Sequence, residues 1–137
     1  RSMQLYAANS YGKVLQLGLG LGLVTHALSS QSEVESVTVI ERHPDVIALV
    51  SPYLAGYPKV KVVCSSWQDF HTDETYDTVI ADLWVANGYA EKMGLYGEVI
   101  SACIDIKSMF HPSRLIVHGF PFMSDINPVR ASVVRRV

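Results

Sequence analysis

Five short apolar runs, separated by longer stretches, constrain the fold of this chain more than any other feature. The runs are almost continuously apolar, as expected of parallel strands that are buried on both faces. They are Lys13–Leu17, Ser36–Ile40, Val60–Cys64, Thr78–Ala81 and Leu115–His118. Alternation of such runs with helices predicts an α/β protein with a doubly wound parallel sheet of about five strands.

The stretches between the runs carry apolar residues at helical spacing, which predicts helices with one buried face. The three stripes are Leu23, Val24, Ala27 and Leu28; Val46, Ile47, Val50 and Leu54; and Leu95, Val99, Ile100, Cys103, Ile106 and Phe110. Pro44 and Pro128 suit the first turn of a helix. We therefore also expect a last helix over Pro128–Arg136.

The length of 137 residues suits one domain, which we expect to span residues 3–137, with the first two residues preceding the natural start at Met3. The net charge of −2 gives no electrostatic reason to expect a nucleic acid or an anionic membrane as a partner. The chain has no membrane-spanning apolar run and no signal-peptide pattern, so the expected location is the cytoplasm. Cys64 and Cys103 lie in apolar runs and are expected to be reduced core residues.

Three glycines at alternate positions, Gly18, Gly20 and Gly22, follow the first apolar run. In a doubly wound sheet, the turn after the first strand lies where ligands bind, at the carboxyl ends of the strands. The spacing differs from the dinucleotide fingerprint, because Leu23 stands where that motif needs a small residue, and it differs from a phosphate loop. A nucleoside-binding turn and a tight turn without a ligand both stay open at this point.

An acidic residue, Glu41, ends the second predicted strand. Its two carboxylate oxygens suit the two hydroxyls of a ribose, one for each oxygen. Taken alone, Glu41 would be interpreted as a solvated residue at the end of a strand. The glycine turn one helix upstream favours the ribose interpretation.

Four segments, taken in order, resemble the successive motifs of class I S-adenosylmethionine-dependent methyltransferases: KVLQLGLGLG, VTVIERHPDVI, VKVVCSSWQDF and YDTVIADLW. A fifth segment is most similar to the spermidine synthase-like branch of that superfamily: GLYGEVISACIDIKSMFHPSRLIVHG. The resemblance covers roughly residues 12–119. It implies S-adenosylmethionine as the cofactor and a Rossmann-like sheet with strand order 3-2-1-4-5. We expect the final antiparallel strand pair that usually completes this sheet to be lacking.

The resemblance implies cofactor-binding roles for residues that follow the strands. They are Gly18, Gly20, Gly22, Glu41, Arg42, Ser66, Trp67 and Asp82, with His43 next to Arg42. The three glycines would line the methionine and ribose portions of the cofactor. Glu41 would hold the ribose hydroxyls, and Arg42 and His43 would border the adenine.

Two positions depart from the family's pattern. Ser66 stands where the family has an acidic contact to the adenine amine. Trp67, the next residue, either compensates by stacking on the purine or caps the edge of the sheet. Gln16 lies in the first predicted strand, where many methyltransferases have an acidic residue.

Asp82 ends the fourth predicted strand and matches the family's active-site aspartate, which would stabilise a positive charge or orient a proton for removal. His118 ends the fifth predicted strand, near the same rim, and is the candidate base. Trp84, Tyr89 and Tyr96 would form the walls of an acceptor pocket. The alternatives are a structural Asp82 that caps a turn and a His118 that belongs to the core. No metal site is proposed.

Methyl transfer to a small molecule is the function that this set of residues favours, because an activated donor needs mainly proximity and alignment. Aminopropyl transfer is the alternative within the same branch, but the family's Asp-Ser-Ser-Asp motif reads DLWV from Asp82. A cofactor-binding module without catalysis is the third interpretation. In the implied strand order, Arg114–Gly119 forms an exposed edge, so we expect a homodimer with Leu115–Phe122 and the last helix at the contact.

Overall fold

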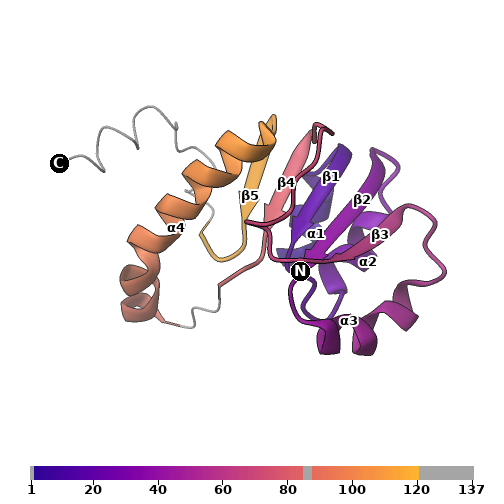
Figure 1. The fold of residues 1–137 in the computed structure, drawn as a ribbon, viewed down its shortest axis with the longest axis horizontal. Coiled ribbons are helices and arrows are strands. Elements are labelled where there is room, and N and C mark those ends of the chain that lie inside the picture. The colour runs from indigo at the N-terminus through magenta and orange to yellow at the C-terminus, as the bar shows by residue number, and fades with distance from the viewer. Residues whose placement is uncertain (1, 85–87, 121–137) are drawn as a thin grey trace.

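The structure, a computed structural model, describes residues 2–84 and 88–120. In chain order the elements are α1 (Ser2–Ala8), β1 (Gly12–Leu17), α2 (Leu23–Ser29), β2 (Val34–Glu41), α3 (Pro44–Val50), the 3-10 helix η1 (Ser51–Leu54), β3 (Val60–Cys64), β4 (Thr78–Ala81), α4 (Tyr89–Phe110) and β5 (Arg114–Val117). The five strands are parallel and lie in the order β3-β2-β1-β4-β5 (Figure 1). The predicted doubly wound α/β sheet with strand order 3-2-1-4-5 is confirmed.

The strand predictions are close to the observed bounds. Val60–Cys64 and Thr78–Ala81 have the predicted ends, and the other three strands differ by one or two residues at an end. Helix α1 was not predicted, because a segment of seven residues is too short to show helical periodicity. The expected last helix and the expected lack of a final strand pair concern residues outside the described part of the chain.

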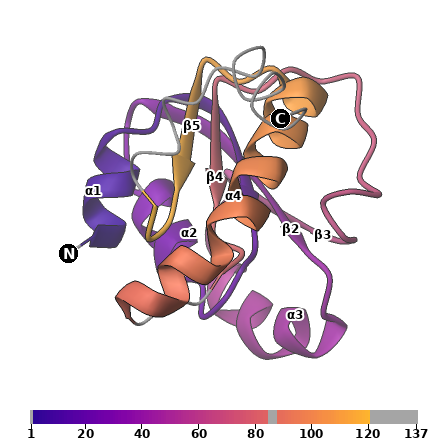
Figure 2. The same cartoon turned by 90° about the vertical axis from the view of Figure 1, so that its left-hand side faces the viewer.

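Helices cover both faces of the sheet. Helices α1 and α2 lie against one face and α4 lies against the other (Figure 2). Successive side chains of a strand point to opposite faces, so Val14 of β1 packs on the side of α2, whereas Leu15 and Leu17 pack on the side of α4. None of the helices within the described ranges is long and apolar enough to cross a membrane.

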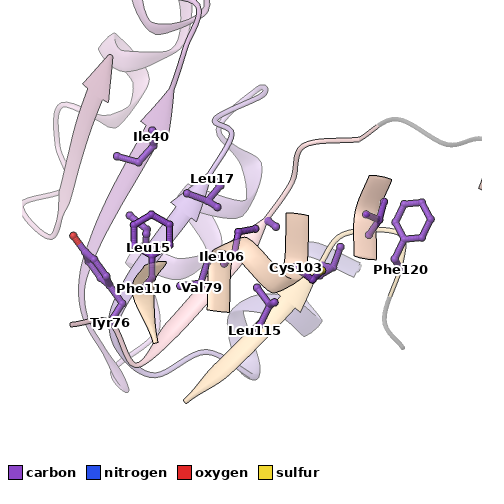
Figure 3. Close-up of a cluster of buried hydrophobic side chains, with 13 residues drawn as sticks. Leu15, Leu17, Ile40, Tyr76, Val79, Cys103, Ile106, Phe110, Leu115 and Phe120 are labelled. Atoms are coloured by element: carbon purple, nitrogen blue, oxygen red, sulfur yellow. The ribbon is translucent and has the colours of Figure 1, made fainter. Parts of the chain in front are cut away.

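The apolar cluster under α4 joins alternate side chains of the strands to one side of the helix (Figure 3). The helix contributes Val99, Cys103, Ile106 and Phe110, each at most 3% exposed. Their spacing of three or four residues places them on one side of an α-helix. This confirms the main part of the predicted stripe and anchors α4 along the sheet.

Two predicted core positions are wrong. Cys64 is exposed, because β3 is an edge strand of the sheet and Cys64 is its last residue. Leu23 is 52% exposed. It begins α2, whose buried side is formed instead by Val24, Thr25 and Leu28. An edge strand and the end of a short helix therefore expose apolar residues that the sequence pattern assigns to the core.

Candidate functional site

The turn between β1 and α2 follows a backbone path that glycine favours. Gly18, Gly20 and Gly22 have φ angles of 95°, 54° and 81°, in the left-handed region. A Cβ atom at Gly18 would overlap the backbone carbonyl of Asp82, the residue after β4. A Cβ atom at Gly22 would lie 2.8 Å from Cγ1 of Val50 in α3, whereas one at Gly20 would meet nothing within 4 Å. Gly18 thus lets the turn approach the end of β4, and Gly22 lets it pack on α3.

Hydrogen bonds hold this turn against the end of β2. The Gly18 N–H donates to the Ile40 carbonyl at 2.8 Å, and the Leu19 N–H donates to Oε1 of Glu41 at 3.0 Å. The Gly22 N–H donates to the Leu19 carbonyl at 3.0 Å. The protein's own groups therefore determine the shape of the turn.

Glu41 is 7% exposed, and each of its carboxylate oxygens accepts a backbone hydrogen bond. Oε1 accepts the N–H of Leu19, and Oε2 accepts the N–H of His43 at 3.0 Å. A carboxylate has about four lone-pair positions, so each oxygen keeps capacity for a further donor. This burial contradicts the alternative of a solvated glutamate at the end of a strand.

A cleft of about 500 Å³ lies next to Glu41, at the carboxyl ends of the first four strands. Its volume is in the range of small-molecule sites. Its walls come from the turn after β1, from the segments after β2, β3 and β4, and from α4; the lining residues are Gly18, Ile40, Glu41, Arg42, His43, Ser65, Ser66, Trp67, Gln68, Asp82, Leu83, Trp84, Glu98, Ser101, Ala102 and Asp105. Within residues 2–84 and 88–120, no group of three or more His, Cys, Asp and Glu side chains could hold a metal ion.

The cleft brings together most of the residues that the sequence singled out. Gly18, Glu41, Arg42, His43, Ser66, Trp67, Asp82 and Trp84 all line it. Gly20, Gly22, Tyr96 and His118 do not line it. Tyr89 begins α4, but its side chain lies outside the described part of the structure.

Ser66 and Trp67 follow β3 and contribute the wall of the cleft on that side of the sheet. The hydroxyl of Ser66 accepts the N–H of Asp69 at 3.2 Å, which holds the segment in a turn. Trp67 is half-buried and packs against the apolar cluster under α4, yet part of it lines the cleft. Trp67 therefore packs against the core and also lines the cleft, and its stacking on a purine stays a prediction.

Asp82 and His118 follow the neighbouring strands β4 and β5, and the His118 N–H donates to the Ala81 carbonyl at 2.9 Å. Burial raises the pKa of the Asp82 carboxyl above its usual value, and the nearby His118 partly opposes this rise. Nδ1 of His118 is a buried atom without a hydrogen-bond partner among the described residues, and its ring packs edge-on against Tyr6. Because His118 adjoins Asp82 without lining the cleft, it can influence that carboxylate but does not face an acceptor.

Helix α4 contributes a wall that the sequence interpretation missed, formed by Glu98, Ser101, Ala102 and Asp105. The spacing i, i+3, i+4 and i+7, next to the apolar stripe, is the signal that could have found it. The Trp84 indole N–H donates to Oε1 of Glu98 at 3.2 Å, which joins the segment after β4 to this wall. Together with Asp82, the carboxylates of Glu98 and Asp105 make this side of the cleft acidic.

Known proteins provide an independent comparison for this fold. No family model matches the chain. Over 77 residues, or 56% of its length, the chain is 32% identical to malonyl-[acyl-carrier protein] O-methyltransferase from Bacillus anthracis. It covers 28% of that enzyme, so the chain spans well under half the length of this curated relative.

Solved structures of methyltransferases resemble the chain over most of its length. The 23S rRNA methyltransferase ErmE matches 85% of the chain with a TM-score of 0.61 and 19% identity, and the chain covers 44% of ErmE. CalS10, an amino pentose methyltransferase from Micromonospora echinaspora bound to S-adenosylmethionine, matches 85% of the chain with a TM-score of 0.56 and 19% identity, and the chain covers 46% of CalS10. With the parallel strand order, these matches show that the chain has the fold of class I S-adenosylmethionine-dependent methyltransferases.

Proposed function

We propose that this protein binds S-adenosylmethionine in the cleft and transfers its methyl group to a small molecule. The observation that carries the proposal is Glu41, a buried carboxylate with acceptor capacity left on each oxygen, next to a left-handed glycine turn. Both ribose hydroxyls find an acceptor there. Ser66 and Trp67, in the same cleft, offer a hydrogen-bonding group and a flat surface to the adenine.

Asp82 is the residue of the cleft best suited to assist the reaction. When bound, S-adenosylmethionine supplies a methyl group that is activated by a positively charged sulfur. The carboxylate of Asp82 stabilises positive charge in the cleft or accepts a proton from the acceptor. Burial raises its pKa, which makes it a stronger base than an exposed aspartate. His118 adjusts this carboxylate from beside it, and alignment of the reactants supplies most of the acceleration.

The acceptor that the cleft favours is a small molecule carrying an amine. Asp82, Glu98 and Asp105 line one side of the cleft, and Trp84 lines it as well. Carboxylates and aromatic faces both attract a cationic group.

The same acidic wall favours a second candidate, aminopropyl transfer to an amine. This reaction fits the resemblance of the α4 segment to spermidine synthases. The apolar residues Leu83 and Trp84, which directly follow Asp82, argue against it, because they replace polar residues of that family's motif.

Calorimetric titration with S-adenosylmethionine, with its demethylated product and with its decarboxylated form tests these assignments. We expect the first two to bind, and a screen with methyl-labelled S-adenosylmethionine to label a member of a small-amine pool. Tighter binding of the decarboxylated form, with an aminopropylated product, would establish the second candidate instead. Binding without transfer to any pool would indicate a cofactor-binding module. Failure of the folded protein to bind any of the three would overturn the proposal.

A further inference from the structure

Gln16, in β1, is fully buried, and both ends of its amide are hydrogen-bonded inside the protein. Its Oε1 accepts the hydroxyl of Thr25 in α2 at 2.9 Å, and its Nε2 donates to the Gly18 carbonyl at 2.9 Å. Gln16 does not line the cleft. Its hydrogen bond to the Gly18 carbonyl connects Gln16 to the turn, and Gly18 lines the cleft.

A single peptide group joins Gln16 to Glu41. The carbonyl of Gly18 and the N–H of Leu19 belong to the same planar unit. The carbonyl accepts from Gln16, and the N–H donates to Oε1 of Glu41 at 3.0 Å. In a trans peptide these two groups point in opposite directions, so Gln16 and Glu41 hold the unit from opposite sides. Rotation of this peptide would break both hydrogen bonds together.

We propose that Gln16 is a positioning residue for the cofactor: through the Gly18–Leu19 peptide it fixes the carboxylate of Glu41 in the orientation that accepts the ribose hydroxyls. This inference rests on the proposed function. The position needs a group that accepts from Thr25 and donates to Gly18, and an amide does both.

Gln16→Met is the sharpest test, because methionine is similar in size but has neither the donor nor the oxygen acceptor of the amide. By titration calorimetry, we expect its affinity for S-adenosylmethionine to be about tenfold to a hundredfold below that of the parent. Gln31→Met makes the same chemical change outside this chain of contacts and should bind like the parent.

Amide hydrogen exchange at Leu19, followed by NMR without cofactor, tests the geometry independently of binding. We expect slow exchange in the parent and in Gln31→Met, and faster exchange in Gln16→Met and in Thr25→Val. Thr25→Ser keeps the hydroxyl and should restore the parent rate. If the variants show this exchange pattern but the parent protein binds no S-adenosylmethionine, the proposed function and the cofactor role of Gln16 are refuted. The role of Gln16 in holding the Gly18–Leu19 peptide is then still established.

Parent-like affinity of Gln16→Met, together with parent-like protection of Leu19, would overturn the positioning role. If Gln16→Met does not fold, Thr25→Val provides the test instead, because it removes only one of the two hydrogen bonds of Gln16. Parent-like affinity and exchange in Thr25→Val would then overturn the proposal.

Discussion

Replacement of Glu41 by alanine tests the cofactor site and the turn that supports it. The carboxylate accepts the N–H groups of Leu19 and His43, both at 3.0 Å. His43 is exposed, so its N–H can turn to water, whereas Leu19 is 2% exposed and its N–H would lose its partner. One unsatisfied buried donor costs about 1–3 kcal/mol, so we expect the free energy of unfolding of Glu41→Ala to fall by about that amount.

We also expect Glu41→Ala to bind S-adenosylmethionine more weakly, because the ribose hydroxyls lose their acceptor. Charge-assisted hydrogen bonds of this kind contribute about 1.5–3 kcal/mol. The dissociation constant should therefore rise about 10- to 150-fold. Glu41→Gln keeps the shape and one oxygen, so it should give an intermediate loss.

Titration calorimetry measures the affinity, and urea denaturation measures the stability at the same pH. Glu35→Ala is the matched control, because Glu35 lies on the same strand and is exposed. We expect this control to change neither quantity by more than about 0.5 kcal/mol. An unchanged dissociation constant in Glu41→Ala, with native circular dichroism, would refute the assignment of the ribose site.

Three further predictions concern the glycine turn after β1, the Asp82 carboxyl in the cleft and the edge strand β5. Gly18→Ala should cost about 2–5 kcal/mol in urea denaturation, because its Cβ would overlap the Asp82 carbonyl, whereas Gly20→Ala should cost only about 1–2 kcal/mol; equal losses would contradict this packing. Burial raises the pKa of Asp82 above its usual 3.8, so the folded state binds this proton more tightly than the unfolded chain, and Asp82 lowers stability as the pH rises through that window. Asp82→Asn should remove this loss, which begins as the pH rises above about 4, and should slow methyl transfer; parallel stability curves for the two proteins would count against it. We propose a homodimer through the edge strand β5, and light scattering that gives a mass near 15.1 kDa at micromolar concentration would contradict it.

The fold could be predicted from the sequence because its determinants are local. Each strand is a short apolar run, and each buried helix side is a stripe of regular spacing, so the elements can be recognised before any partner is known. The glycines at 18, 20 and 22 and the acidic residue at the end of β2 mark the ligand edge for the same reason. The strand order followed from the family resemblance, and the structure has that order.

The tertiary structure decided which of these residues meet. The acidic wall of α4 depends on how the helix lies along the sheet, and the exposure of Cys64 depends on β3 being at its edge. The role of Gln16 was hidden for a similar reason. In the sequence it is a polar residue in an apolar run, and only the fold places Thr25 on one side of it and the Gly18 carbonyl on the other. Periodicity reports which side of an element is buried, whereas the partner of a buried polar group depends on the packing of elements that are distant in the chain.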